Sequence, residues 1–131
     1  MKTIMIVDDD QFVRENLIYS IKFFFELLTV SSKVMPEFVE AKNGSQAWYF
    51  LTEDKIVPDL MIVDFQMPGM NGDHLIDKIQ KELELNSEIA IHSGYFPAEA
   101  EAQRLGCRFI PKLGGEKKIF DLALEMGLFV P

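Results

Sequence analysis

Residues 58–72 read PDLMIVDFQMPGMNG, and this stretch decides the fold that the sequence predicts. It contains a continuous apolar run, residues 60–63, which stops abruptly at Asp64. Unbroken apolar runs of this length are typical of strands covered on both faces, as in a parallel sheet between two layers of helices. The stretch therefore predicts a buried strand with a carboxylate at its carboxyl end.

Similar short apolar runs recur along the chain, and each is followed by polar residues. They are residues 4–7 before Asp8-Asp9-Asp10, residues 89–91 before His92-Ser93, and residues 109–110 before Pro111-Lys112. Residues 37–41 alternate apolar and polar side chains, which indicates a less buried strand. The sequence thus predicts four further strands around the same kind of core.

The segments between these runs show helical periodicity. Apolar side chains three or four residues apart occur within residues 13–28, 47–51, 75–83, 98–105 and 119–124. Asp10 is placed to cap the first helix, Pro97 fits the first turn of the fourth, and Gly106 is placed to end it. The alternation predicts an α/β fold, a doubly wound (βα)5 three-layer sandwich. Right-handed crossovers then put all strand carboxyl ends at one edge, where ligands bind in such sheets.

Chemically active residues fall at that predicted edge: Asp8, Asp9, Asp64, Ser93 and Lys112. Three carboxylates within a few ångströms would repel one another by about 4 kcal/mol per pair at the dielectric typical of protein surfaces. A divalent cation neutralises such a cluster, and Mg²⁺ prefers one or two carboxylates, several waters and a phosphate. A carboxylate can also attack a phosphoryl group, whose oxygens a metal, a lysine and a hydroxyl then stabilise. The pattern predicts phosphoryl transfer to an aspartate.

Four segments together resemble the response regulator receiver family of the chemotaxis CheY type. They are residues 6–10 with Arg14 downstream, 58–72, 92–94 and 109–112. The resemblance covers essentially the whole chain and implies one receiver domain over residues 1–131. It also implies a five-stranded parallel sheet in the flavodoxin-like order 2-1-3-4-5.

The resemblance also implies roles for the acidic residues. Asp64 is expected to be the phosphoacceptor. Asp9 is expected to bind Mg²⁺ (or Mn²⁺) directly, and Asp8 largely through water. Gln66 is expected to offer its backbone carbonyl to the metal, with Asp64 as a further ligand.

On the other side of the implied site, Lys112 is expected to pair with the phosphoryl oxygens. Ser93 and Phe109 take the switch positions, so Phe109 is expected to turn inward when Ser93 moves toward the phosphoryl group. Two residues depart from the family pattern. Leu113 stands where a proline, commonly cis, is usual, and Phe109 lacks a phenolic hydroxyl.

The implied function is that of a response regulator in a two-component phosphorelay. A histidine kinase or histidine phosphotransfer protein would donate the phosphoryl group, and the fourth helix, fifth strand and fifth helix would form the face that switches binding of a downstream protein. Such a domain turns over no external metabolite and is not expected to be an enzyme. No output domain follows residues 126–131, which leaves open a stand-alone regulator or a domain of a longer protein.

The composition of the chain argues against several classes of partner and location. The formal net charge of −8 argues against direct nucleic acid binding, which calls for clustered Lys and Arg. No apolar run approaches the roughly 20 residues of a membrane span, and the N-terminus does not resemble a signal peptide. We therefore expect a cytoplasmic protein that is a monomer or a phosphorylation-dependent dimer.

Two other functions remain open from the residues alone. Asp8 and Asp10 imitate the nucleophile motif of phosphatases of the haloacid dehalogenase type, although Phe12 stands where Thr or Val is common there. A receiver-like interaction module that works without phosphorylation is the second.

Several other residues are not expected to take part in catalysis or metal binding. The single cysteine, Cys107, has no disulfide partner in the chain, and His74 and His92 lack the further ligands of a zinc site, so we expect both histidines at the surface or half-buried. The aromatic run 23–25 predicts mainly core positions with one exposed ring, or alternatively a partner surface. It opens a segment, residues 23–36, that is longer than is usual in the family.

Overall fold

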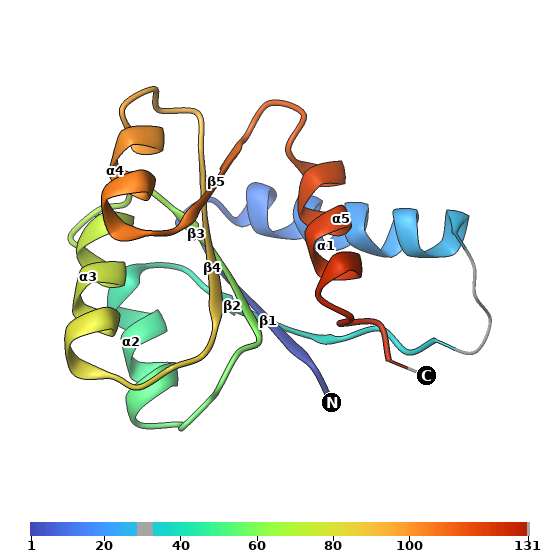
Figure 1. The fold of residues 1–131 in the computed structure, drawn as a ribbon, viewed down its shortest axis with the longest axis horizontal. Helices are drawn as coiled ribbons and strands as arrows, with labels where there is room; N and C mark the ends of the chain where they lie inside the picture. Colours follow the sequence, from blue (N-terminus) through green and yellow to red (C-terminus); the bar gives the residue numbers. More distant parts are fainter. Residues whose placement is uncertain (29–32, 131) are drawn as a thin grey trace.

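A five-stranded parallel sheet forms the centre of the molecule (Figure 1). The computed structural model describes residues 1–28 and 33–130. Its strands are β1 (Thr3–Val7), β2 (Glu37–Ala41), β3 (Leu60–Asp64), β4 (Glu88–Ser93) and β5 (Arg108–Pro111). They lie side by side in the order β2-β1-β3-β4-β5, and every neighbouring pair is parallel. The strand order implied by the sequence is confirmed.

Two layers of helices cover the sheet. The helices are α1 (Gln11–Leu27), α2 (Gly44–Thr52), α3 (Gly72–Glu82), α4 (Ala98–Leu105) and α5 (Glu116–Glu125). Figure 1 shows α1 and α5 on one side of the sheet and α2, α3 and α4 on the other. None of the helices within the described ranges is long and apolar enough to cross a membrane.

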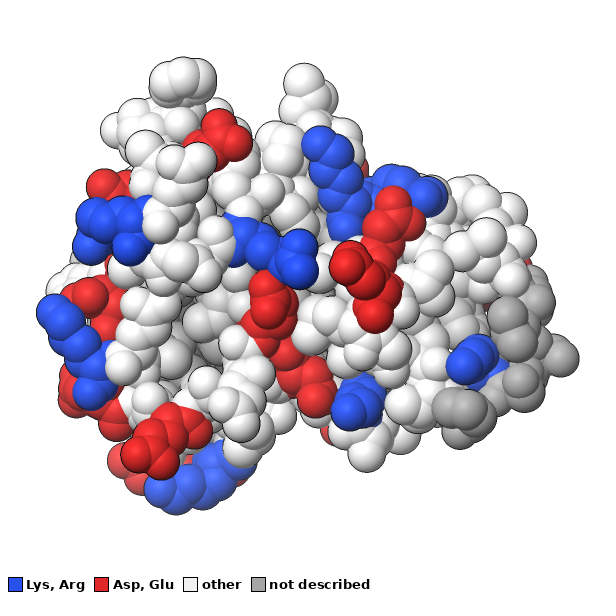
Figure 2. Space-filling model, viewed as in Figure 1, with Lys and Arg blue, Asp and Glu red and all other residues white. Residues whose placement is uncertain are grey.

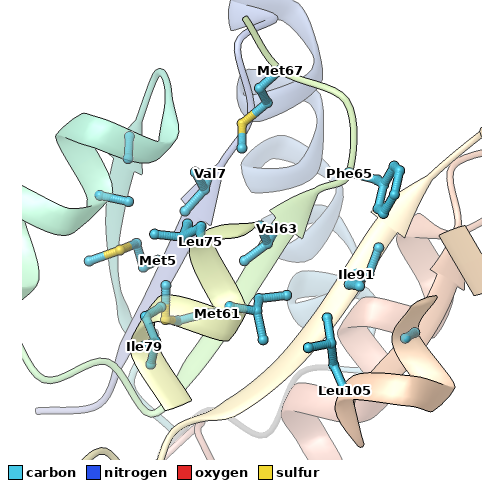
Figure 3. Close-up of a cluster of buried hydrophobic side chains, with 14 of the residues drawn as sticks. Met5, Val7, Met61, Val63, Phe65, Met67, Leu75, Ile79, Ile91 and Leu105 are labelled. Carbon is cyan, nitrogen blue, oxygen red and sulfur yellow. The ribbon is translucent and has the colours of Figure 1, made fainter. Parts of the chain in front are cut away.

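Each apolar run of the central strands supplies both layers of the core, because side chains alternate along a strand. In β3, Met61 and Val63 face α2, α3 and α4, where Figure 3 shows them with Met5, Val7 and Ile91. Leu60 and Ile62 face α1 and α5. This two-sided burial explains why the runs have no polar residue until the strand ends.

The predicted helix boundaries are largely confirmed. The side chain of Asp10 accepts a hydrogen bond from the backbone N–H of Phe12 at 2.9 Å and caps α1. Pro97 is the residue directly before α4 and not part of its first turn. Gly106 ends α4 with a left-handed φ of 71°. Part of the long 23–36 segment, residues 29–32, lies outside the described residues.

Gly72, at the start of α3, lies against the carboxyl end of β3. Its N–H donates to the carbonyl of Phe65 at 2.8 Å, and a Cβ at this position would collide with the backbone carbonyl oxygen of Asp64. The final glycine of the 58–72 stretch therefore permits a close approach between the helix and the strand end that carries Asp64.

Replacing Gly72 by alanine is expected to lower the free energy of unfolding by about 1–3 kcal/mol, the usual cost of forcing extra atoms into a packed site. Urea unfolding followed by circular dichroism measures it. Gly94→Ala is the matched control, because a Cβ at Gly94 meets nothing within 4 Å and should change the stability by less than about 0.5 kcal/mol. Equal midpoints for the two variants would contradict the close-contact explanation.

Candidate functional site

The carboxyl ends of four adjacent strands bring the candidate residues together. Asp8 and Asp9 follow β1, Asp64 ends β3, Ser93 ends β4, and Lys112 follows β5. The second strand, β2, lies at the outer edge of the sheet, beyond β1. The prediction that these residues share one edge is confirmed.

The three acids form a compact cluster. One carboxylate oxygen from each of Asp8, Asp9 and Asp64 lies within 4.8 Å of the other two, and within the described part of the chain this is the group of carboxylate, His and Cys side chains close enough to hold a metal ion. Asp8 and Asp64 are buried, with 2% and 5% of their surface exposed, whereas Asp9 is exposed. The cluster therefore opens to solvent on the side of Asp9.

The two oxygens of Asp8 have different surroundings. Oδ1 accepts the backbone N–H of Asp10 at 2.9 Å, while the buried Oδ2 has the ammonium group of Lys112 as its charged neighbour at 3.1 Å. The three acids offer only carboxylate oxygens, which are the ligands that a hard divalent cation such as Mg²⁺ prefers.

Lys112 joins the acids from the opposite side. Its Nζ lies 3.1 Å from Oδ2 of Asp8 and 3.3 Å from Oδ1 of Asp64. Burial alone would lower the pKa of Lys112, but Asp64 and Asp8 more than offset it and raise the pKa above its ordinary value. Lys112 is therefore a fixed positive charge at this edge.

The carboxyl group of Asp64 is a weaker acid than an ordinary aspartate. Burial, and then the neighbouring charge of Asp8, raise its pKa from 3.8 to about 6, although Lys112 acts in the opposite direction. The carboxylate is ionised at neutral pH, but at a cost that a cation beside it would reduce.

The switch candidates lie on the β4 and β5 side. Ser93 is buried, and its Oγ accepts the backbone N–H of Tyr95 at 2.9 Å, while its carbonyl accepts the N–H of Lys112 at 3.1 Å. Phe109 is half-buried beside a groove of about 250 Å³ that Ser93 and Lys112 also line. Gln66 is exposed two residues after Asp64. Leu113, where the family pattern has a proline, is 94% exposed.

Three contacts at the site were not predicted from the sequence. The guanidinium of Arg14 donates to the carbonyl of Asp8 at 2.7 Å and pairs with Glu40 at 3.1 Å, which ties the end of β1 to β2. The rings of Phe65 and Tyr95 stack at 5.5 Å, which joins the loops after β3 and β4. The position of Arg14 after the acidic triplet was the only available signal, and nothing in the sequence pairs Phe65 with Tyr95.

The prediction for His92 was wrong. It is only 3% exposed, and neither ring nitrogen has a hydrogen-bond partner within the described ranges. Burial, and then Lys112, lower its pKa to about 4, so the ring is neutral. His74 is exposed as expected, and Cys107 is half-buried with a pKa that burial raises.

Comparison with known proteins identifies the family of this chain. A family model described as the response regulator receiver domain matches residues 4–107, most of the chain, including the acidic pair and Asp64. The chain belongs to the response regulator receiver family. The CheY-like fold of this receiver domain follows from the same match and from its strand order.

Individual relatives agree. Over 91 residues, 70% of this chain and 37% of the relative, the receiver domain is 31% identical to the nitrate/nitrite response regulator protein NarL of Escherichia coli. The chain spans about a third of the length of the curated relatives that it matches, 30% to 37%.

Two solved structures share the fold. One is a two-component transcriptional regulator, AraC, from Clostridium phytofermentans, with a TM-score of 0.75 at 24% identity over 96% of this chain and 92% of that one. The other is response regulator TrrA from Thermotoga maritima, solved in complex with Mg(2+)-BeF, with a TM-score of 0.69 at 22% identity over 96% of this chain and 99% of that one. At these identities the likeness concerns the fold alone.

Proposed function

We propose that this receiver domain accepts a phosphoryl group from a phosphohistidine onto Asp64, and that the modification switches its binding to a downstream protein. The donor is a histidine kinase or a histidine phosphotransfer protein. The observation that carries the proposal is the position of Lys112, whose Nζ lies between Asp8 and Asp64 beside three clustered carboxylates. An acidic nucleophile with one fixed cation and a candidate metal site meets the needs of phosphoryl transfer.

The metal proposed for this site is Mg²⁺ (or Mn²⁺). Asp8, Asp9 and Asp64 would hold it with carboxylate oxygens, and Gln66 with its backbone carbonyl. When bound, the metal supplies positive charge that stabilises the phosphoryl oxygens.

The transfer step uses the chain's own groups as follows. A carboxylate oxygen of Asp64 forms a bond to phosphorus while the bond between phosphorus and the donor's imidazole nitrogen breaks, and the electron pair stays on that nitrogen. Lys112 holds a phosphoryl oxygen, and the hydroxyl of Ser93 donates a hydrogen bond to another. Water later attacks the phosphorus, the bond between phosphorus and the Asp64 oxygen breaks, and inorganic phosphate leaves, which regenerates the carboxylate. The domain turns over no external metabolite, and we do not class it as an enzyme.

The switch follows from the same contacts. Ser93 leaves its contact with the N–H of Tyr95 and moves toward the phosphoryl group, and Phe109 turns inward beside it. These shifts bias two conformations of the face formed by α4, β5 and α5. That face then binds or releases the downstream protein.

We propose that the domain acts in the cytoplasm and that it binds neither nucleic acid nor membrane itself. Figure 2 shows Lys and Arg scattered among Asp and Glu, without a continuous basic area on the face displayed. We place one receiver domain in residues 1–131. Monomer and phosphorylation-dependent dimer are both compatible with the proposed cycle.

Incubation with acetyl phosphate and Mg²⁺ tests the proposal. We expect the intact mass to rise by one phosphoryl group, with the label mapped by peptide analysis to Asp64, and no uptake after chelation of the metal. A label on Asp8 would support the phosphatase-like alternative. No label, together with unimpaired binding to a partner, would support the interaction module that works without phosphorylation.

A further inference from the structure

The outward face of α1 carries a stripe of exposed apolar side chains. Phe12, Tyr19, Phe23 and Leu27 are 82%, 69%, 45% and 66% exposed. Their spacings of seven and four residues place them on one side of the helix. The opposite side of α1 holds Leu17 and Ile21, which are buried in the core with α5. The fold therefore uses one face of α1 and leaves this α1 stripe in solvent.

The size of the α1 stripe is that of an interaction surface. An aromatic side chain offers about 150–250 Å², so the exposed fractions amount to roughly 500 Å² of apolar area in each molecule. That area lies in the range of the largest patches on monomeric proteins, which are often functional. Within the stripe, the rings of Tyr19 and Phe23 stack with centroids 6.4 Å apart.

The polar residues beside the α1 stripe are complementary to themselves. Glu15 and Lys22 are both exposed, lie seven residues apart, and therefore border the stripe on the same flank. In an antiparallel pair of identical helices, each flank meets the same flank of the other copy. Glu15 of either copy then faces Lys22 of the other, and the pair occurs twice.

We propose that the α1 stripe binds a second copy of this chain, with the two α1 helices antiparallel around a two-fold axis near Tyr19. In the register set by the two Glu15–Lys22 pairs, Phe23 of one copy fits between Phe12 and Asn16 of the other. With about 500 Å² of apolar area from each copy, the contact buries about 1,000 Å² in total, the lower bound for a biological interface. This contact does not use Asp64 and stands independently of the phosphoryl-transfer proposal.

Sedimentation velocity over a wide range of protein concentration tests the contact. The chain without substitutions is expected to shift from monomer to dimer as its concentration rises. Tyr19→Glu and Phe23→Glu should each raise the dissociation constant by at least about tenfold, since each introduces a charge into an apolar contact. Tyr49→Glu is the matched control, because Tyr49 is an exposed aromatic residue of α2 outside the stripe. Circular dichroism reports that each variant is folded.

Charge reversal tests the identity of the partner. Glu15→Lys and Lys22→Glu should each weaken the dimer, because each places like charges opposite one another. Mixing these two variants, or combining both changes in one chain, should restore it.

A chain that sediments as a monomer at every concentration would overturn the proposal, even if the stripe variants then impaired binding to a different protein. A dimer that persists in Tyr19→Glu and Phe23→Glu would also overturn it. So would a mixture of the two charge variants that associates no better than either alone.

Discussion

Asp64→Asn is expected to abolish phosphoryl uptake from acetyl phosphate and Mg²⁺. The amide retains the shape of the side chain but removes the oxygen proposed as the nucleophile, and the two neighbouring acids have different surroundings. Asp8 is engaged with the N–H of Asp10 and with Lys112, and Asp9 is exposed. Intact mass spectrometry measures the loss. Asp10→Asn is the matched control, since Asp10 caps α1 and asparagine caps a helix equally well. Uptake that survives at the level of the unmodified chain would contradict the assignment of Asp64.

The same substitution should change stability in a pH-dependent way. The pKa of Asp64 is raised from 3.8 to about 6 in the folded chain, so between these values the folded state holds more protons than the unfolded state. Stability from this group therefore falls as the pH rises from about 4 to about 6. In metal-free solution at neutral pH, Asp64→Asn should raise the free energy of unfolding by about 3 kcal/mol, and the gain should vanish below about pH 4. Asp121→Asn, on the exposed surface of α5, should show no such gain.

Lys112→Ala is expected to lower the rate of phosphoryl uptake by about 100- to 1000-fold, the usual effect of removing one preorganised group that stabilises transition-state charge. The substitution also removes the positive charge that lies 3.1 Å from the buried Oδ2 of Asp8 and 3.3 Å from Asp64. Repulsion between the two carboxylates then rises, so the pKa of Asp64 should rise further.

The measurement is the initial rate of labelling by acetyl phosphate at saturating Mg²⁺. Lys117→Ala serves as control, because Lys117 forms an exposed pair with Asp121 on α5. A rate within a factor of a few of the unmodified chain would show that Lys112 does not contact the transferred group. Nuclear magnetic resonance titration of the Asp64 carboxyl reports the pKa separately.

The strands and the shared edge could be predicted because they depend on local patterns. Residues 60–63 form a strand buried on both faces, and such a run does not need its partners to be recognised. Once strand and helix alternate, handedness alone places Asp8, Asp64 and Lys112 at one edge. The clustering of the candidate site residues could therefore be predicted from the sequence alone.

The contacts that were missed depend on packing between distant segments. His92 belongs to β4, and its burial follows from the helices α1 and α5 that cover that face of the sheet, not from its immediate neighbours. Arg14 reaches Glu40 only because β2 pairs with β1, the strand that leads into α1. The exposure of Tyr19 could not be predicted for a similar reason. Helical periodicity identifies the buried side of α1, but it does not show whether another element covers the opposite side.

The position of β3 within the sheet has a consequence for local opening. This strand is hydrogen-bonded on both sides, to β1 and to β4, and all five of its residues are buried. Amide protons in such a strand exchange with solvent only when most of the molecule unfolds, whereas those of surface loops exchange through small fluctuations. Asp64, the proposed nucleophile, is thus anchored to the slowest-exchanging part of the chain, whereas Lys112 lies in the loop after β5, a kind of segment that opens more often.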